Sequence, residues 1–177
     1  MGGNGDDVLV VKSSTGNGQS GNDWIYITNE NAKALGGAGE DHLFGSPGND
    51  LSKLFGGEDT DYIYGLGGND GIVGQGGDFV YGGEGNDTLT STEQGGNTLI
   101  GGPGNNLFRI EETVSDVDGR TTIQDFQIST GNRIRFKKDV PYDICSPLLS
   151  YDEVRYAGCT SDVLYAEFFD NVMTLLK

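Results

Sequence analysis

The first 109 residues repeat one pattern of polar and hydrophobic positions about every nine residues. Most copies have a glycine-rich half, then an acid at the sixth position, and a single aliphatic residue two places later. These aliphatic residues are Leu9, Ile25, Leu43, Ile63, Ile72, Val80, Leu89 and Leu99. Successive side chains of a strand point to opposite faces, so the end of each copy predicts a short strand with its middle residue inward. Such regular spacing favours a stacked repeat over a disordered glycine-rich tract.

The copies differ in how closely they keep the pattern. The clearest are GGNGDDVLV at 2–10, GGAGEDHLF at 36–44, GGEGNDTLT at 82–90 and GGPGNNLFR at 101–109, and looser copies lie at 18–26, 45–53, 56–64, 65–73, 74–81 and 94–100. We interpret Leu54 and Phe55 as an insertion between copies. Asp59 replaces a glycine, and the copy that contains Asp78 is one residue short.

Two copies together predict one coil of about 18 residues. Their strands would stack into two parallel sheets, with turns along both edges and a thin aliphatic core between the sheets. The expected fold is therefore all-β, a parallel β-roll of nonapeptide repeats over residues 1–109, followed by capping β-strands at 110–177.

Composition supports this fold and narrows the function. Residues 1–108 hold 28 of the 31 glycines, and the formal net charge of the chain is −16. So much glycine disfavours helices, and no apolar run is long enough for a transmembrane helix. The acidity argues against nucleic acid, because phosphate contacts need clustered basic residues. It suits calcium, which takes carboxylate and carbonyl oxygens.

The repeat GGxGxDxUx, in which U is a large aliphatic residue, resembles the calcium-binding nonapeptide of RTX (repeats-in-toxin) proteins. The number of copies makes the resemblance specific, and it covers residues 2–109. It implies a calcium ion between successive turns on the same edge. Each ion would be held by the acid and the carbonyls of positions 2 and 4 in one copy, and by the acid and the carbonyls of positions 1 and 3 in the next same-side copy.

Carried over to this sequence, the resemblance gives six ligand sets. On one edge they are Asp7, Gly3 and Gly5 with Asp23, Gly18 and Ser20; Asp23, Gln19 and Gly21 with Asp41, Gly36 and Ala38; Asp41, Gly37 and Gly39 with Asp61, Gly56 and Glu58; and Asp61, Gly57 and Asp59 with Asp78, Gly74 and Gly76. On the other edge they are Asp50, Ser46 and Gly48 with Asp70, Gly65 and Gly67; and Asp70, Leu66 and Gly68 with Asp87, Gly82 and Glu84. Asn97 and Asn106 replace the acid in the last copies and should weaken or empty those sites. We expect about four to six Ca²⁺ ions.

Residues 107–136 resemble the segment that follows the repeats in serralysin-type proteases and alginate epimerase R-modules. The resemblance rests on Ile123, Asp125 and Phe126, then on Gly131, Asn132, Arg133 and Ile134. It implies a cap on the open end of the roll. Residues 162–177 read as two strands. Their end, Asp170 to Leu176, resembles an uncleaved type I secretion signal, and a plain terminal hairpin explains it equally well.

Other candidate chemistry is sparse. If the chain is secreted, Cys145 and Cys159 favour a disulfide worth about 3 kcal/mol over two buried thiols. His42 is the single histidine and lacks partners for a zinc site or a nucleophile triad. Each carboxylate pair has a calcium explanation, so we predict no catalytic site. No basic and apolar leader follows Met1, which agrees with C-terminal export or with a fragment of a larger protein.

Alternate copies lie on the same sheet, so their outward residues share one face. One of the two faces carries an unusual set of side chains. Its outward positions hold Trp24, Tyr26, His42, Phe44, Tyr62, Tyr64, Phe79 and Tyr81, whereas the opposite face would show Leu51, Lys53, Gly71, Val73, Thr88 and Thr90, without an aromatic. We expect two aromatic ladders, which either stabilise the sheet or bind a partner.

These observations lead to three hypotheses for a secreted or cell-surface protein. The leading one is a non-catalytic RTX module that folds on binding calcium. The second is a polysaccharide-binding module of a secreted enzyme, with Arg133, Arg135, Lys137 and Lys138 as its only basic cluster. The third is an adhesive or surface structural protein that uses the aromatic face to bind a protein or to self-associate.

Overall fold

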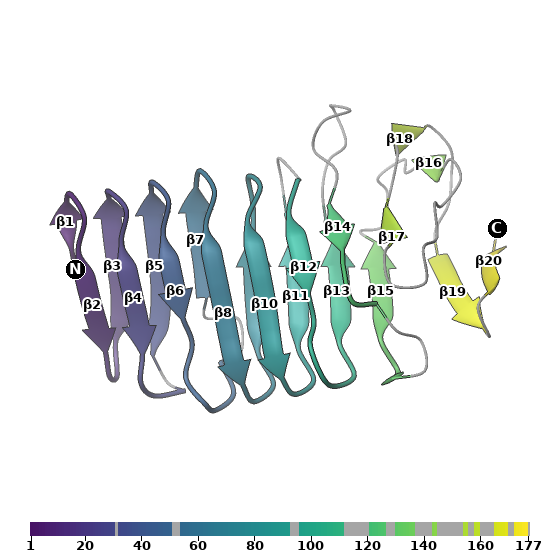
Figure 1. Cartoon of the computed structure of the whole chain (residues 1–177), viewed down its shortest axis with the longest axis horizontal. Helices are drawn as coiled ribbons and strands as arrows, with labels where there is room; N and C mark the ends of the chain where they lie inside the picture. Colours follow the sequence, from purple (N-terminus) through teal and green to yellow (C-terminus); the bar gives the residue numbers. More distant parts are fainter. Residues whose placement is uncertain are drawn as a thin grey trace.

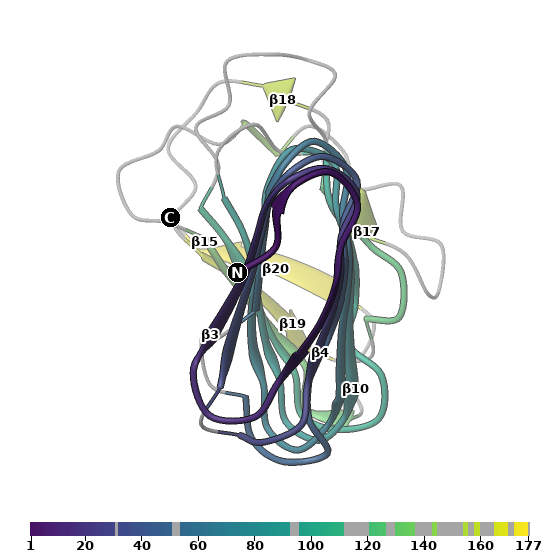
Figure 2. The ribbon, with the colours of Figure 1, turned by 90° about the vertical axis from the view of Figure 1, so that its left-hand side faces the viewer.

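The chain winds into stacked coils that form one parallel β-solenoid. A computed structural model describes residues 1–30, 32–50, 54–92, 96–111, 121–126 and 130–136, together with the backbone of five strand segments between 143 and 176. The solenoid has about six turns of about 18 residues each, as the sequence predicts. Figure 1 shows its strands side by side along the long axis, and Figure 2 shows the narrow core between two facing sheets.

All regular elements of the described residues are strands, and two eight-stranded sheets make up the solenoid. Sheet A contains β1 (Gly3–Asn4), β3 (Thr15–Ser20), β5 (Lys33–Ala38), β7 (Leu54–Glu58), β9 (Gly71–Gly74), β11 (Thr88–Ser91), β13 (Leu107–Ile110) and β15 (Arg133–Phe136). Sheet B contains β2 (Val8–Val11), β4 (Trp24–Ile27), β6 (His42–Phe44), β8 (Tyr62–Gly67), β10 (Phe79–Glu84), β12 (Thr98–Ile100), β14 (Thr122–Ile123) and β17 (Val154–Arg155). No helix long and apolar enough to cross a membrane lies in the described part of the chain.

The predicted column of aliphatic residues forms the core. Seven of the eight are fully buried: Ile25, Leu43, Ile63, Ile72, Val80, Leu89 and Leu99. Leu9, in the first coil of the structure, is partly buried. Parallel pairing keeps these residues in register, as in Leu43↔Ile63 and Ile63↔Val80. This column runs through the core, and some strands add a second buried residue, such as Ile27 of β4 and Ile110 of β13.

Leu54 and Phe55 are not an insertion between copies, because both belong to strand β7 and pair with the neighbouring strands. Leu54 pairs with Ala34 and with Ile72, and it is fully buried, so it is the inward residue of its strand. Phe55 points outward and packs under the ammonium group of Lys33, 4.4 Å from the ring centroid. The prediction that this face carries no aromatic is therefore wrong. The predicted outward residues Leu51 and Lys53 lie outside the described residues.

The sheets continue past the last recognisable copy. β14 pairs in parallel with β12, and β15 pairs in parallel with β13, so residues 122–136 extend both sheets. β17 then pairs antiparallel with β14, and its backbone covers that edge of sheet B.

Two small antiparallel pairs follow the solenoid. One joins β16 (Asp143–Ile144) to β18 (Gly158–Cys159), and the other joins β19 (Tyr165–Phe169) to β20 (Val172–Leu176). The second pair is the predicted terminal hairpin. The proposed Cys145–Cys159 disulfide and the Asp170 end of the proposed secretion signal lie outside the described residues.

Candidate metal centre

The aspartates at the sixth position of the copies form two columns, one on each edge of the solenoid. At edge 1, where the chain passes from sheet A to sheet B, the column is Asp7, Asp23, Asp41, Asp61, Asp78 and then Asn97. At edge 2, where it passes from sheet B to sheet A, the column is Asp50, Asp70, Asp87, Asn106 and then Asn132. Apart from Asp7, all of these side chains are buried.

One oxygen of each side chain joins its turn to the preceding turn. On edge 1 the backbone N–H of Asp23 donates to Oδ1 of Asp41 (2.7 Å), and the N–H of Asp41 donates to Oδ1 of Asp61 (2.8 Å). Edge 2 has the same ladder, from Asp70 N–H to Asp87 Oδ1 (2.9 Å). The asparagines continue it, since Asp87 N–H donates to Oδ1 of Asn106 (2.9 Å). An amide oxygen therefore serves this contact as well as a carboxylate oxygen does.

The second oxygen differs. The Oδ2 atoms of five residues are buried without a hydrogen-bond partner: Asp23, Asp41, Asp61, Asp70 and Asp87. A buried carboxylate oxygen without a donor or a cation costs several kcal/mol. Five such atoms in equivalent turns indicate a binding position.

Backbone carbonyls of the next turn face these free oxygens. A Cβ on Gly82 would collide with Oδ2 of Asp87 and would lie 2.6 Å from the carbonyl oxygen of Gly101. Similarly, a Cβ on Gly18 would collide with Oδ2 of Asp23 and would lie 2.7 Å from the carbonyl oxygen of Gly36. Glycine at the first position thus leaves open a small space between a carboxylate and a carbonyl. Charged and carbonyl oxygens are the donors that hard divalent cations prefer.

Burial makes these carboxylates difficult to ionise without a cation. It raises the pKa of Asp61 to about 8, and the charges of Asp78, Asp41 and Asp59 add to the increase, against the opposing hydrogen bond from Asp41. Burial likewise raises the pKa of Asp41 to about 6 and that of Asp70 to about 7. The same cause raises the pKa of Asp87. A bound cation would favour the charged forms.

The comparison with protein families decides what these turns are. RTX calcium-binding nonapeptide repeats match in four copies, at residues 35–72, 52–78, 72–94 and 91–109. The solenoid is an RTX β-roll. RTX repeats bind Ca²⁺ and are typical of secreted proteins. No curated protein and no solved structure matches the chain significantly.

The turns of the predicted ligand sets on edge 1 lie next to one another in the β-roll. The Asp7, Asp23 and Asp41 turns lie in successive coils of edge 1, joined by the N–H to Oδ1 ladder, and Asp61 follows them. The carbonyls of positions 2 and 4 lie close to the backbone of the next same-edge turn. Thus a Cβ on Gly39 would lie 2.5 Å from the oxygen of Gly21, and one on Gly37 would collide with that of Gln19.

The position-3 carbonyls have an additional role. The oxygens of Ser20 and Ala38 accept the N–H of Gly5 (2.7 Å) and Gly21 (2.9 Å), and the oxygen of Glu84 accepts that of Gly68 (2.8 Å). These carbonyls hold adjacent turns together even before any ion is considered.

The turn of Asp50 departs from the others. Its Oδ2 accepts the N–H of Ser46 (2.5 Å), and its Oδ1 accepts the hydroxyl of Ser46 (3.1 Å). The same hydroxyl accepts the N–H of Gly48 (3.2 Å). The predicted pairing of Asp50 with Asp70 therefore has a satisfied carboxylate where the other pairs have a free oxygen. Asp78 is similar, because its Oδ2 accepts the N–H of Gln75 (2.9 Å).

The sequence did not predict two features of these turns. One is the free oxygen of Asp87 beside the turn of Asn106, and the other is a second ladder of hydrogen bonds. Asp87 faces Gly101 in the turn of Asn106 with a free Oδ2, although Asn106 carries no charge. The fifth position forms a second, exposed ladder on edge 2, in which Asn49, Asn69 and Asn86 each accept the N–H of the fifth-position residue in the next turn. The recurring Asn at this position is the sequence signal for that ladder.

No group of three or more His, Cys, Asp or Glu side chains that could hold a metal occurs in the described part of the chain. His42 lies on the outer face of sheet B, stacked between Trp24 (4.4 Å) and Tyr62 (4.8 Å).

Proposed function

We propose that this β-roll is a non-catalytic module that folds by binding calcium between its turns. The observation that carries the proposal is the set of five buried Oδ2 atoms without a partner, repeated on both edges. A first-position carbonyl of the next same-edge turn lies close to the Oδ2 atom in the turns of Asp23, Asp41, Asp70 and Asp87. Ca²⁺ takes six to eight oxygen ligands from carboxylates, carbonyls and water, and such a donor set fits it better than zinc or other softer metals.

The proposed ions lie between the turns of Asp23 and Asp41, Asp41 and Asp61, and Asp61 and Asp78 on edge 1. On edge 2 they lie between the turns of Asp70 and Asp87, and of Asp87 and Asn106. Asp7 begins a further pair with Asp23, but its side chain is only partly buried in the first coil, so this site should be weaker. The pair of Asp50 and Asp70 should stay empty, because Ser46 already satisfies Asp50.

Calcium would supply much of the folding free energy. Without it, buried carboxylates repel one another and lack partners, and the hydrophobic core between the sheets is thin. Binding of an ion to the folded chain alone stabilises that state by mass action. The roll should therefore be loose or unfolded at low calcium and ordered at high calcium.

This dependence suits type I secretion. A chain that stays unfolded at low cytosolic calcium can cross a narrow channel and then fold outside the cell. The support is the family's typical secretion and the charge of the turns.

Counting the ions in matched variants tests the proposal. Native mass spectrometry and calorimetric titration with Ca²⁺ should give five strong sites and one weak site. Asp87→Asn should lower the count by one, because an amide nitrogen replaces the free oxygen. Asp50→Asn is the control on the same edge and should leave the count unchanged.

Circular dichroism in EDTA and then in excess calcium provides the folding measurement. Strand signal should increase on adding calcium. A full strand signal in EDTA would contradict folding on binding, and an equal loss of ions in both variants would contradict the proposed site assignment.

A further inference from the structure

Asp59 occupies a position at which the preceding turns of edge 1 have glycine. It is the fourth residue in the turn of Asp61, and the three turns before it have Gly5, Gly21 and Gly39 there. Its φ is 74°, in the left-handed region that strains residues other than glycine. Aspartate tolerates this region better than most residues, but glycine would adopt it without strain. A strained residue at this position points to a role for its side chain.

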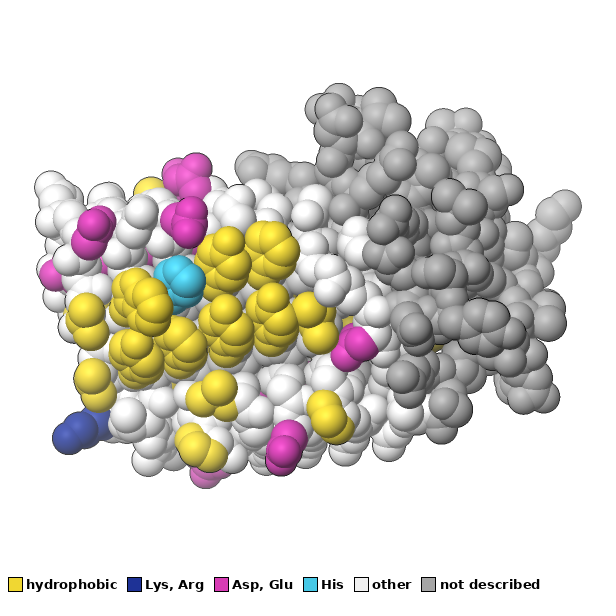
Figure 3. All heavy atoms as spheres, in the orientation of Figure 1, with side chains coloured by type: hydrophobic (Ala, Val, Ile, Leu, Met, Phe, Trp, Pro, Cys, Tyr) yellow, Lys and Arg dark blue, Asp and Glu magenta, His cyan; other side chains and the backbone are white. Residues whose placement is uncertain are grey.

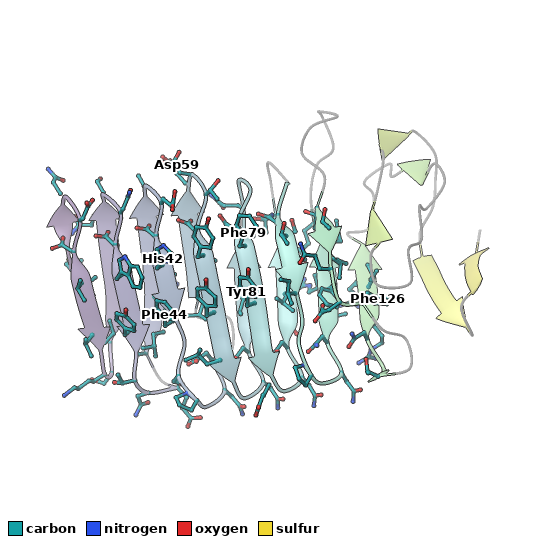
Figure 4. All side chains as sticks on the ribbon, viewed as in Figure 1. His42, Phe44, Asp59, Phe79, Tyr81 and Phe126 are labelled. Carbon is teal, nitrogen blue, oxygen red and sulfur yellow. The ribbon has the colours of Figure 1, made fainter. Side chains whose placement is uncertain are left out.

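The side chain of Asp59 reaches back to the preceding turn of the same edge. Its Oδ2 accepts the backbone N–H of Gly39 (3.1 Å). One coil earlier, the equivalent N–H of Gly21 donates to the position-3 carbonyl of Ala38 (2.9 Å). The Asp59 carboxylate thus takes the place of a backbone carbonyl in the contact between two turns. Figure 4 shows Asp59 at this edge of the solenoid.

The same two turns enclose a buried oxygen that lacks a partner. Asp41 is fully buried, and its Oδ2 has no hydrogen-bond donor. A Cβ on Gly36 would collide both with this oxygen and with the carbonyl oxygen of Gly56, in the turn of Asp61. The carboxylate oxygen and the carbonyl therefore face one small space. Asp59 belongs to the turn that supplies the carbonyl, and its side chain contacts the turn that supplies Oδ2.

The charge of Asp59 acts on both aspartates of this pair. Burial is the main cause of the raised pKa of Asp41, about 6, and of Asp61, about 8, and the charge of Asp59 adds to the increase in both. Figure 3 shows acidic side chains gathered along this edge, beside the hydrophobic patch of the aromatic ladders. Repulsion among these carboxylates raises the free energy of the cation-free turns, and a bound cation would remove it.

We propose that the Asp59 side chain supplies a second carboxylate to the calcium site between the turns of Asp41 and Asp61. This rests on the proposed function, because it ranks the sites proposed there. The calcium affinity of an oxygen site depends on the number of its charged ligands. The preceding edge-1 turns have glycine at this position and offer one free carboxylate oxygen each. The site of Asp41 and Asp61 is therefore the tightest, and its turns become ordered first as calcium rises.

Calorimetric titration with Ca²⁺ of two matched variants tests this role. Asp59→Asn keeps an oxygen for the N–H of Gly39 and a residue that tolerates the left-handed backbone, so it removes mainly the charge. It should weaken the tightest site about tenfold or more, whereas a merely structural role would survive the change. Glu40→Gln removes the same charge from an exposed position in the turn of Asp41 and should change this affinity by less than about twofold.

Double variants assign the effect to one site. Asp41→Asn removes the free oxygen but keeps the oxygen of the ladder, so adding Asp59→Asn to it should cost little more affinity. Added to Asp87→Asn, on the other edge, Asp59→Asn should have its full effect. Circular dichroism in saturating calcium checks that each variant folds. Equal affinities of Asp59→Asn and Glu40→Gln, or full additivity with Asp41→Asn, would overturn the role of Asp59 and leave the proposed function intact. A wild-type chain that binds no calcium would overturn both.

Discussion

Turns with aspartate and turns with asparagine have the same backbone arrangement in this molecule, and they differ in one side-chain atom. In both, Oδ1 accepts the N–H of the preceding same-edge turn. In the aspartate turns the other atom is an oxygen that lacks a donor at five positions. In Asn106 that atom is a nitrogen, which donates to the carbonyl of Gly102 (2.9 Å). Asn97 donates to the hydroxyl of Ser91 (2.5 Å).

The difference separates two roles that the repeat combines. The shape of the turn comes from glycine and from the Oδ1 ladder, and it is complete without a cation. Only Oδ2 lacks a partner in the absence of a cation, so this atom alone makes the turn depend on calcium. The asparagine turns satisfy themselves by internal hydrogen bonds, so the C-terminal coils should keep their order where the aspartate turns lose it.

Removal of calcium should have the largest effect on stability, and the effect should differ between the two kinds of turn. In EDTA, backbone amides at 15–91 should exchange quickly, because their turns contain uncompensated buried carboxylates. Those at 98–110 should keep partial protection, since their turns carry Asn97 and Asn106. Hydrogen exchange followed by mass spectrometry measures both regions in one sample. Uniform loss of protection across the roll would show that the two kinds of turn are not independent.

Alanine at the fourth position should damage both kinds of turn equally. Gly85 has φ of 135° and Gly104 has φ of 142°, and a Cβ at either would collide with the carbonyl oxygen of the preceding same-edge turn. Gly85→Ala and Gly104→Ala should each destabilise the calcium-bound chain by about 3 kcal/mol or more. Thermal unfolding in excess calcium measures this. A tolerated Gly104→Ala would mean that the asparagine turn has a different geometry.

Exchange of one atom should convert one kind of turn into the other. Asn106→Asp replaces a satisfied nitrogen by a free oxygen, which should destabilise the calcium-free chain by about 1–3 kcal/mol. Excess calcium should reverse the loss. Urea unfolding with and without calcium gives both values, with Asn105→Asp at the exposed fifth position as the control. No calcium-dependent difference between the two variants would contradict the role given to Oδ2.

Acid should have the smallest effect, and only on the aspartate turns. The pKa values of Asp41, Asp61 and Asp70 lie above the usual 3.8 in the folded chain, at about 6, 8 and 7. Their contribution to the stability of the calcium-free chain is complete below pH 4 and is lost as pH rises towards 8. Strand signal in EDTA should therefore be higher at pH 5 than at pH 8. A higher signal at pH 8 would reverse the sign and contradict the burial of these carboxylates.

The sequence predicted the architecture, and its site positions remain predictions. A nine-residue period leaves little freedom, since each inward residue, such as Ile63 or Val80, must align with its neighbours for the sheets to pair. The alternation of copies between the two sheets likewise predicted both aromatic ladders. The position of a residue in the repeat follows from counting along the chain, so it can be read directly from the sequence.

Local hydrogen bonds could not be read in the same way. Nothing in the spacing shows that Ser46 satisfies both oxygens of Asp50, or that Leu54 replaces the expected inward residue of its strand. The site of Asp87 was missed because the sequence rule counts one acid from each turn, whereas the free oxygen comes from the earlier turn alone. These outcomes depend on which donors reach which atoms after folding.

The shared ladder has a consequence for charge balance along each edge. In a column of ions, each site takes its free carboxylate oxygen from the earlier turn alone, so there is about one carboxylate per divalent ion. A filled edge then carries about one excess positive charge per coil. Exposed acids lie on the same turns of edge 1, among them Glu40, Glu58 and Asp59. These carboxylates can balance the excess positive charge, which allows neighbouring ions to occupy sites only one strand spacing apart.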